Sequence, residues 1–444
     1  MQAEFGDVYQ FWVGPMRVIG LCNAEDIQHV FGHRHIYEQG SLYRDHHTHF
    51  FSEAIICNIG AKYKRHASII LPLFRRSNVL DSLELINDCT DQLLDRWRSK
   101  NDDPTRIHLD IGKQCQDLLL AIFGLIGFDF DLQTLTDDDN DAKNNKLTKS
   151  LHEFLNIFMM TIAMPSIMTK IYLKFSTRYR QAFNIINDYV DSIIEQEQNK
   201  TQESIGKRKR NSLIASLVYS LHQDKKNEAT KSNDKQKGLS RTEVLHEILL
   251  FLIAGYETTS CALTWFIHLM SKNPRVQAKI KAELGDNKFQ RLSIEQLDSL
   301  DYLNCVIQEV LHFSSPAVST FRTVTVDDRL PASGAQLYKG DELMINMYNL
   351  TRDKRYWKID PDLFYPERFQ GDDKDHHPYA SIPFGGGHRQ CIGQELARLE
   401  LKAITSRLMQ HVTFRDGGPE VNAGGHNQTL TLMPKNVGVI ITFD

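Results

Sequence analysis

Apolar residues recur at helical spacing along most of this 444-residue chain. The repeats predict helices at 77–98, 109–127, 148–160, 178–197, 240–271 and 295–313. The longest of these segments, 240–271, begins with Ser240 and has Glu243 three residues later, which is the pattern of a capping box. It ends before Pro274, a residue that cannot continue a helix.

Segments with strand character lie near the two ends of the chain. Residues 7–21 are rich in β-branched and aromatic side chains around a Gly-Pro break and predict a hairpin, and shorter strands are expected at 320–326 and 343–348. Residues 429–442 alternate apolar and polar positions around a turn. We therefore expect a mainly α fold with a minor β-sheet region, and one large domain over 1–444, because no linker or repeat divides the chain.

Three segments depart from the amphipathic pattern. The polar segments 132–147 and 221–239 are expected to be exposed loops, and the basic run 207–210 is interpreted as part of a solvated loop rather than a nucleic-acid patch. Residues 155–168 carry no charge, and their length is typical of a buried or interfacial segment. We interpret them as core or substrate-channel wall, with contact to a membrane surface as the alternative.

Composition excludes several classes of protein. The net charge of −4 gives no polycation for nucleic acid. The seven cysteines include no CxxC pair, so neither a disulfide framework nor a zinc ribbon is indicated. No stretch reaches about 18 uncharged apolar residues, so no membrane-spanning helix is predicted.

One cysteine lies in an unusual local sequence. Residues 384–393, FGGGHRQCIG, surround Cys391 with glycines that allow a large flat ligand to approach the backbone, and a helix pattern follows directly. A helix N-terminus stabilises an anion, so this sulfur is expected to be a thiolate. The residues alone leave it open whether the thiolate is a nucleophile beside His388, a zinc ligand or a haem ligand, and a buried structural cysteine is the plain alternative.

The loop resembles a known signature. Phe384, Gly387, Arg389, Cys391 and Gly393 match the pattern F-x-x-G-x-R-x-C-x-G of the cytochrome P450 superfamily. The resemblance implies a single haem domain with haem b (iron protoporphyrin IX), in which Cys391 is the axial ligand. It also implies a monooxygenase that inserts one oxygen atom from O2 into a small apolar organic substrate.

A second motif supports this resemblance. The sequence AGYETT at 254–259 resembles the oxygen-binding motif of the family, with Ala254 and Gly255 beside the haem and Glu257 and Thr258 as the acid and alcohol that deliver protons. The plain alternative is a threonine bonded to its own helix carbonyl and a glutamate on a solvated face.

Two arginines are assigned to the haem by the same resemblance. Arg322 and Arg389 match positions that contact haem propionates, and a guanidinium can bind a carboxylate bidentately. The candidates for the substrate pocket are all apolar or small: Phe251, Ala254, Ala317, Val318 and Leu432.

Two departures from the family pattern affect haem retention. His312 stands where the E-x-x-R motif has its arginine, so the expected network is Glu309 with His312 and with Arg368 of the P-E-R-F element. In the W-x-x-x-R helix, Tyr63 and Ala67 replace the tryptophan and the arginine, and helical geometry directs Arg65 and His66 elsewhere. These losses motivate an alternative function, a degenerate and catalytically silent haem-binding or interaction protein.

The remaining expectations concern partners and location. The chain has no GxGxxG fingerprint, so a separate NADPH-dependent flavoprotein reductase is expected as electron donor, with Arg75 and Arg76 as a candidate docking patch. The resemblance favours the endoplasmic-reticulum membrane, whereas the sequence as it stands, without an anchor helix, suggests a cytoplasmic or peripheral protein. The cluster of His46, His47 and His49 is interpreted as a loop near the substrate entrance rather than a metal site.

Overall fold

Helices form most of the structure, a computed structural model that describes residues 2–14, 16–99, 103–135, 144–162, 164–199, 212–225, 238–285, 290–422, 424–428 and 430–444. The helices are α1 Gln2–Phe5, α2 Ala24–Gly32, α3 Ser41–Phe51, α4 Gly60–Ile70, α5 Arg76–Val79, α6 Leu83–Ser99, α7 Ile111–Phe128, α8 Asn144–Thr161, α9 Ser166–Phe175, α10 Thr177–Gln198, α12 Leu213–Lys225, α13 Arg241–Lys272, α14 Pro274–Leu284, α15 Ile294–Asp298, α16 Asp301–Phe313, α17 Met347–Arg352 and α18 Gln394–His411.

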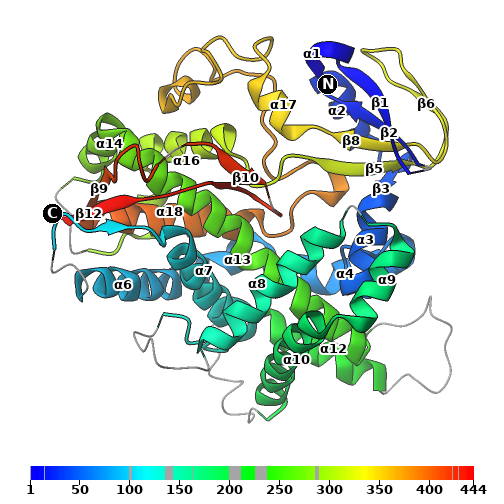
Figure 1. Ribbon diagram of the computed structural model, residues 1–444, viewed down its shortest axis with the longest axis horizontal. Helices are drawn as coiled ribbons and strands as arrows, with labels where there is room; N and C mark the ends of the chain where they lie inside the picture. Colours follow the sequence, from blue (N-terminus) through cyan, green and yellow to red (C-terminus); the bar gives the residue numbers. More distant parts are fainter. Residues whose placement is uncertain are drawn as a thin grey trace.

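The strands form small sheets at the edges of the helical body (Figure 1). The largest has the order β1-β2-β8-β5-β3, and its β1–β2 hairpin pairs Val13 with Met16 as the residue pattern predicts. The strands are β1 Val8–Val13, β2 Met16–Leu21, β3 Tyr37–Gln39, β4 Ile107–His108, β5 Thr320–Val324, β6 Asp328–Arg329, β7 Gln336–Leu337, β8 Glu342–Ile345, β9 Val412–Asp416, β10 His426–Gln428, β11 Leu432–Pro434 and β12 Val439–Phe443.

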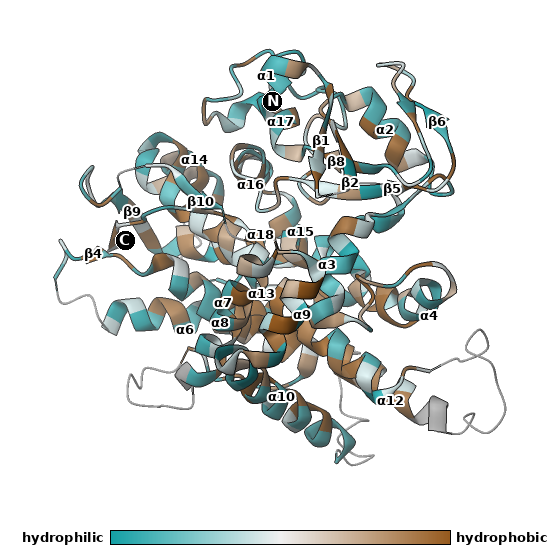
Figure 2. Ribbon diagram, turned by 45° about the vertical axis from the view of Figure 1, so that its right-hand side comes forward, coloured by the Kyte–Doolittle hydropathy of each residue, from teal (hydrophilic) through white to brown (hydrophobic). Residues whose placement is uncertain are grey.

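The long helix α13 crosses the middle of the molecule (Figure 1). It begins at the predicted capping box, where Ser240 accepts from the Glu243 amide and the Glu243 carboxylate accepts from the Ser240 amide. It packs against α7, and the hydropathy colouring is brown around α13 and largely teal along α10 at the edge (Figure 2). The mainly α fold with minor sheets is thus confirmed.

Two predicted elements differ from the structure. The segment 295–313 forms two helices, α15 and α16, because the chain turns at Ser299 and Leu300. The segment 429–442 is not one hairpin, since β11 pairs with β10 and β12 pairs with β9 and β4. Alternation gives strand character but does not specify the partner strand.

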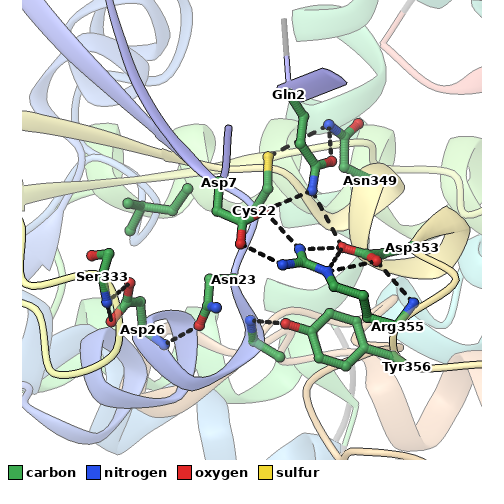
Figure 3. Close-up of polar contacts among 12 residues, drawn as sticks. Gln2, Asp7, Cys22, Asn23, Asp26, Ser333, Asn349, Asp353, Arg355 and Tyr356 are labelled. Carbon is green, nitrogen blue, oxygen red and sulfur yellow. Dashed lines mark hydrogen bonds and ion pairs between the residues drawn. The ribbon is translucent and has the colours of Figure 1, made fainter. Parts of the chain in front are cut away.

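Hydrogen bonds fix the N-terminal segment to the chain that follows α17 (Figure 3). Arg355 donates to both carboxylate oxygens of Asp7 at 2.6 Å and also pairs with Asp353. Tyr356 accepts from the Ala24 amide at 2.9 Å. These contacts hold the first sheet against the segment that leads to the cysteine loop.

The uncharged segment 155–168 divides between the core and the surface. The end of α8 buries Leu155, Ile157 and Phe158, whereas Ile162 and Ile167, on either side of the α8–α9 turn, are 50% and 74% exposed. The core interpretation therefore holds only for its first half. Of the predicted polar loops, 144–147 begins α8, 221–225 ends α12, and 136–143, 226–237 and the basic run 207–210 lie outside the described residues.

Two helices, Ile111–Phe128 and Arg241–Lys272, are long and apolar enough to cross a membrane, contrary to the expectation from the sequence. Their apolar windows are 78% and 83% buried inside the fold, and the two helices pack on each other. Burial in the core explains their composition.

Candidate active site

Cys391 lies at the end of the loop 384–391, whose conformation is fixed by two close contacts. The Cys391 amide donates to the Phe384 carbonyl at 2.9 Å, and α18 begins three residues after the cysteine with Gly393 as its N-cap residue. Gly387 has φ +68°, and a Cβ there would lie 2.5 Å from the Phe31 carbonyl oxygen. Only glycine fits this position, so α2 and the loop meet closely and the sulfur is held at the start of α18.

The sulfur faces a cavity of about 370 Å³ between α13 and α18. Its walls contain most of the residues that the sequence assigns to a haem site. Of those candidates, the wall includes Phe251, Ala254, Gly255, Thr258, Ala317, Arg322, Phe384, Arg389, Cys391 and Gly393. Segments far apart in the sequence are thus brought together around one space.

Two opposing influences act on the pKa of the Cys391 thiol. Burial raises the pKa of the Cys391 thiol, and a hydrogen bond from the Gly393 backbone lowers it only in part. The thiolate expected from the helix N-terminus stays a prediction, and burial works against it in the free thiol. A metal ion that binds the sulfur deprotonates a coordinating thiol directly, so the site suits a metal-ligated cysteine better than a free nucleophile.

Arg322 is a buried cation that forms no ion pair with a carboxylate among the described residues. It is 2% exposed, and its guanidinium donates to the Phe321 carbonyl at 2.7 Å, the Gly386 carbonyl at 3.3 Å and the Thr320 hydroxyl at 3.2 Å. Burial, and next the charge of Arg389, lower its pKa to about 10. Because a buried charge requires compensation, this end of the cavity suits an anionic group.

Arg389 is held in place by protein groups. It donates to the Glu38 carboxylate and to the Asn58 carbonyl, each at 2.8 Å, and its guanidinium carbon lies 3.6 Å from the centre of the Tyr63 ring. Tyr63 in turn donates to the His388 carbonyl at 3.0 Å. Although Tyr63 replaces the family tryptophan, it supports Arg389 through a cation–π contact.

The helix that resembles W-x-x-x-R makes no substitute for the missing arginine. Ala67 is buried in the core, as the sequence implies. Arg65 pairs with Glu243, and His66 contacts Glu247 at 2.5 Å, so both side chains bind α13. The expectation that Arg65 and His66 point elsewhere agrees with these contacts.

Thr258 and Glu257 occupy different environments. Thr258 lies on the cavity wall, and its hydroxyl donates to the Ala254 carbonyl at 3.2 Å. Glu257 is buried behind the wall, where it accepts from Gln116 at 3.0 Å and from Thr431 at 3.2 Å. Burial raises its pKa, which these two hydrogen bonds lower in part.

The plain alternative for this motif agrees with the structure for Thr258 but not for Glu257. The threonine does bond to its own helix carbonyl, whereas the glutamate is not on a solvated face. In this conformation Glu257 does not line the cavity, so it reaches the cavity only if its side chain turns. The small Gly255 serves helix packing, since a Cβ there would lie 2.4 Å from the Phe123 ring.

Behind the loop, Glu309 and Arg368 keep the expected pairing. Arg368 donates from Nε to Glu309 at 2.9 Å, and the Tyr365 amide donates to the same carboxylate at 2.6 Å. His312 is also buried, but its ring packs 4.3 Å from Trp357, and neither ring nitrogen makes a hydrogen bond of good geometry. Burial holds the pKa of His312 well below its usual value, so the ring is neutral.

Arg352 occupies part of the space around His312. It donates to the Phe313 carbonyl at 2.5 Å and to the Pro361 carbonyl at 2.7 Å, and Pro361 precedes the P-E-R-F element. A cation thus still links the end of α16 to the following segment although His312 carries no charge. The sequence analysis did not single out Arg352.

Some predicted residues lie elsewhere than the sequence analysis expected, and some cavity-lining residues were not predicted. Val318 and Leu432 are not on the cavity wall; the Leu432 carbonyl accepts from Trp265 at 2.6 Å inside the core. The three histidines 46, 47 and 49 lie on helix α3, not in a loop, and His46 and His47 contact the carbonyls of Phe158 and Tyr43. Cavity-lining residues that the sequence analysis missed include Gln39, Tyr43, Phe123, Thr259, Met347 and Glu400.

Comparison with known proteins agrees with this site. The chain belongs to the cytochrome P450 family, because the family model "Cytochrome P450" matches residues 1–440. Proteins of this family are oxidoreductases of the monooxygenase type with a haem-thiolate cofactor, and they use oxygen and a redox partner. A cavity that combines a cysteine sulfur with two arginines fits such a cofactor.

Curated relatives cover nearly the whole chain at modest identity. "Cytochrome P450 4V2" of Homo sapiens is 26% identical over 96% of this chain and 80% of its own length. "Cytochrome P450 3A14" of Cavia porcellus is 26% identical over 93% of this chain and 79% of its own length. "Cytochrome P450 monooxygenase 205" of Postia placenta is 25% identical over 93% of this chain and 80% of its own length.

Proposed function

We propose that Cys391 is the axial ligand of haem b and that this chain inserts one oxygen atom from O2 into a small apolar substrate. The observation that carries the proposal is the single cavity shared by Cys391, Thr258 and Arg322. When bound, the haem supplies the oxygen chemistry. The chain supplies ligation, charge compensation, proton delivery and an apolar space.

Each role is assigned to a particular side chain. Arg322 and Arg389 bind the two haem propionates, and the buried Arg322 gains the anionic partner that it lacks among the described residues. Phe384, Gly387 and Gly393 would shape the loop that holds the haem, and the small Ala254 would leave room for it beside α13, while Gly255 allows α13 to pack on Phe123. Glu309 with Arg368 stabilises the segment behind the loop, and His312 fills the adjoining space.

Thr258 is proposed to hold a proton at its hydroxyl on the cavity wall. Glu257, whose pKa burial raises, turns from Gln116 and Thr431 to renew that proton. The substrate occupies the apolar part of the cavity, where Phe251 and Ala317 lie on the wall. These side chains favour uncharged, apolar molecules.

The electron donor is proposed to be a separate NADPH-dependent flavoprotein reductase. Arg75 and Arg76 are exposed, and Arg76 lies near Arg398 and Lys402 of α18, which do not line the cavity of Cys391; these cations support docking of an acidic surface there. Arg76 already pairs with Asp298 at 2.6 Å, so its attraction for a partner is reduced.

Peripheral contact with the endoplasmic-reticulum membrane is the proposed location. The α8–α9 region exposes a group of apolar side chains beside Lys170 and Lys174, a combination that binds an anionic lipid surface. The exposed apolar residues of this group are Met160, Ile162, Ile167, Met168, Ile171 and Phe175.

Turnover with a reductase tests the oxygen-inserting function. The reconstituted protein should convert an apolar substrate with consumption of NADPH and O2. Thr258→Val should lower product formed per NADPH by about tenfold or more while substrate binding is kept, since loss of a positioned proton donor costs at least that. Equal product yields from the two proteins would contradict the role of Thr258.

A catalytically silent haem-binding or interaction protein is the second candidate. The neutral His312 and the apolar Ala67, at positions where the family has arginines, favour it. This candidate predicts that haem binds but that no NADPH-dependent product forms with any of a panel of apolar substrates. Product formation would exclude it.

A further inference from the structure

Glu38 of β3 is paired with the arginine of the cysteine loop. Its Oε1 atom accepts from Nη2 of Arg389 at 2.8 Å and from Nε at 3.2 Å, and it lies 3.5 Å from Nε2 of His388. The Glu38 side chain is 27% exposed, whereas the Arg389 side chain is only 5% exposed. One of the two arginines proposed to bind haem propionates thus already has a carboxylate partner in the protein.

Glu38 is negatively charged at neutral pH. Burial raises its pKa, but hydrogen bonds with His388, the Gln39 amide and Arg389 outweigh burial and lower the pKa to about 2. The Gln39 amide donates to the same Oε1 atom at 2.8 Å. The contact between Glu38 and Arg389 is therefore an ion pair, because a guanidinium stays protonated in proteins.

The other contacts of Arg389 fix its orientation and leave part of it available. Nη2 also donates to the Asn58 carbonyl at 2.8 Å, and the Tyr63 ring lies against the guanidinium. Nη1 makes no hydrogen bond within the described part of the chain. Arg389 lines the cavity and Glu38 does not. Arg389 therefore keeps N–H donors for a second anion while Glu38 offsets its charge.

The charges around this end of the cavity do not match those of haem b. Arg322 and Arg389 are two cations and Glu38 is one anion, which leaves one net positive charge for two propionates. Glu38 lies opposite Thr323, the residue after Arg322, in the pairing of β3 with β5, so its charge is close to both arginines. The buried Ala67 supplies no third cation.

We propose that Glu38 weakens the retention of haem by competing with a propionate for Arg389. The inference rests on the proposed function, since it requires haem in the cavity. Glu38 acts through Arg389 and is therefore a positioning residue. Its carboxylate also compensates the charge of Arg389 within the protein, and a buried guanidinium without an anion is costly. Retention is thus set by the balance between two anions on one guanidinium.

Release of haem to an excess of a haem-scavenging protein tests the competition. Glu38→Gln keeps an oxygen that accepts from Arg389 but removes the charge, so haem should leave this variant about tenfold more slowly than wild type. Glu38→Asp keeps the charge and should release haem at a rate closer to that of wild type. Glu420→Gln, an exposed control, should not differ from wild type. Unchanged or faster release from Glu38→Gln would overturn the proposal.

Haem dimethyl ester separates the effect of charge from an effect on packing. Its two esterified propionates carry no charge, so wild type and Glu38→Gln should release it at the same rate. If Glu38→Gln slowed release of the dimethyl ester as much as release of haem, the substitution would act by repacking the site, and charge competition would be wrong.

The reduction potential of the bound haem gives a measurement that does not depend on release. Removal of a nearby negative charge favours the reduced iron, so the potential should be higher in Glu38→Gln than in wild type and unchanged in Glu420→Gln. A potential that stays the same or falls in Glu38→Gln would contradict a charge beside the haem.

The inference and the proposed function fail in different ways. If wild type lacks the spectrum of thiolate-ligated haem, the proposed function fails. If that spectrum is present and Glu38→Gln matches wild type in haem release and in reduction potential, the function stands and the role of Glu38 is wrong.

Discussion

Arg368 and Glu309 form an ion pair of 2.9 Å in which neither side chain has any exposed surface. The pair joins α16 to the P-E-R-F segment, and the carboxylate also accepts from the Tyr365 amide. Burial raises the pKa of Glu309 to about 7 even though Arg368 lowers it. The network behind the cysteine loop therefore depends on one arginine, with His312 packed beside it as a neutral ring.

Removal of Arg368 should lower the free energy of unfolding strongly, whereas removal of the ring nitrogens of His312 should lower it only slightly. Arg368→Ala leaves a buried carboxyl without its partner and should lower the free energy of unfolding by about 3–5 kcal/mol. His312→Phe keeps the packing on Trp357 and should cost less than about 1.5 kcal/mol. Urea unfolding and haem content of both variants measure this difference. A larger loss for His312→Phe would mean that its nitrogens are bound.

Close packing of α7 on α13 gives a second prediction. Gly255→Ala places a Cβ 2.4 Å from the Phe123 ring and should destabilise the protein by about 1–3 kcal/mol. Gly112→Ala, on α7, meets only Met433 at 3.5 Å and Thr264 at 3.8 Å and should gain up to about 1 kcal/mol from helix propensity. Thermal unfolding compares the two. Equal effects would contradict the contact between Gly255 and Phe123.

The cationic end of the cavity, which contains Arg322, can be tested through haem release. Arg322→Gln removes a buried cation that has no carboxylate partner in the described part of the chain, and a charged hydrogen bond contributes about 1.5–3 kcal/mol. Haem should leave this variant about 10- to 100-fold faster in transfer to an excess of a haem-scavenging protein. Arg415→Gln, an exposed control bonded to Thr442, should release haem at the wild-type rate. Equal rates in all three proteins would place the propionates elsewhere.

The buried Glu400 also predicts how stability depends on pH. Below about pH 4.5 its carboxyl is protonated in the folded and unfolded states alike, whereas between 4.5 and about 8 only the folded state keeps the proton. The free energy of unfolding should therefore fall as the pH rises through this window, by at most several kcal/mol. Glu309 contributes in the same direction up to about pH 7.

Glu400→Gln isolates the contribution of that one group. The variant should lose less stability than wild type between pH 5 and 8, as measured by urea midpoints at a series of pH values. Parallel curves for the two proteins would mean that Glu400 is ionised in the folded state.

The sequence predicted the long elements and the cysteine loop well. Helix α13 lies within one residue of the predicted 240–271, because its capping box and apolar length are local features. The sequence analysis assigned the histidines of α3 to a loop, because polar side chains there give no helical repeat of apolar residues. The helix is instead supported by packing of His46 on Phe158. Local pattern does not report such tertiary support.

Site residues that belong to a sequence motif could be predicted. Site residues whose position depends only on tertiary packing could not. Cys391, Arg322 and Thr258 share one cavity, as their motifs imply. Leu432 was a candidate pocket residue but is buried against Trp265, and Glu400, which lines the cavity between Leu399 and Leu401, belongs to no motif that the sequence analysis used. Which side of a helix faces a cavity is set by its packing and cannot be read from composition.

The most direct test of the account is the carbon monoxide difference spectrum of the dithionite-reduced protein, measured for wild type and Cys391→Ser. Wild type should give the red-shifted Soret band of thiolate-ligated haem, because Cys391 faces the cavity at the start of α18. Cys391→Ser should lose that band while its far-ultraviolet circular dichroism is unchanged. A folded wild-type protein that binds haem without the red-shifted band, or a Cys391→Ser variant that keeps it, would contradict the assignment of Cys391 as the ligand.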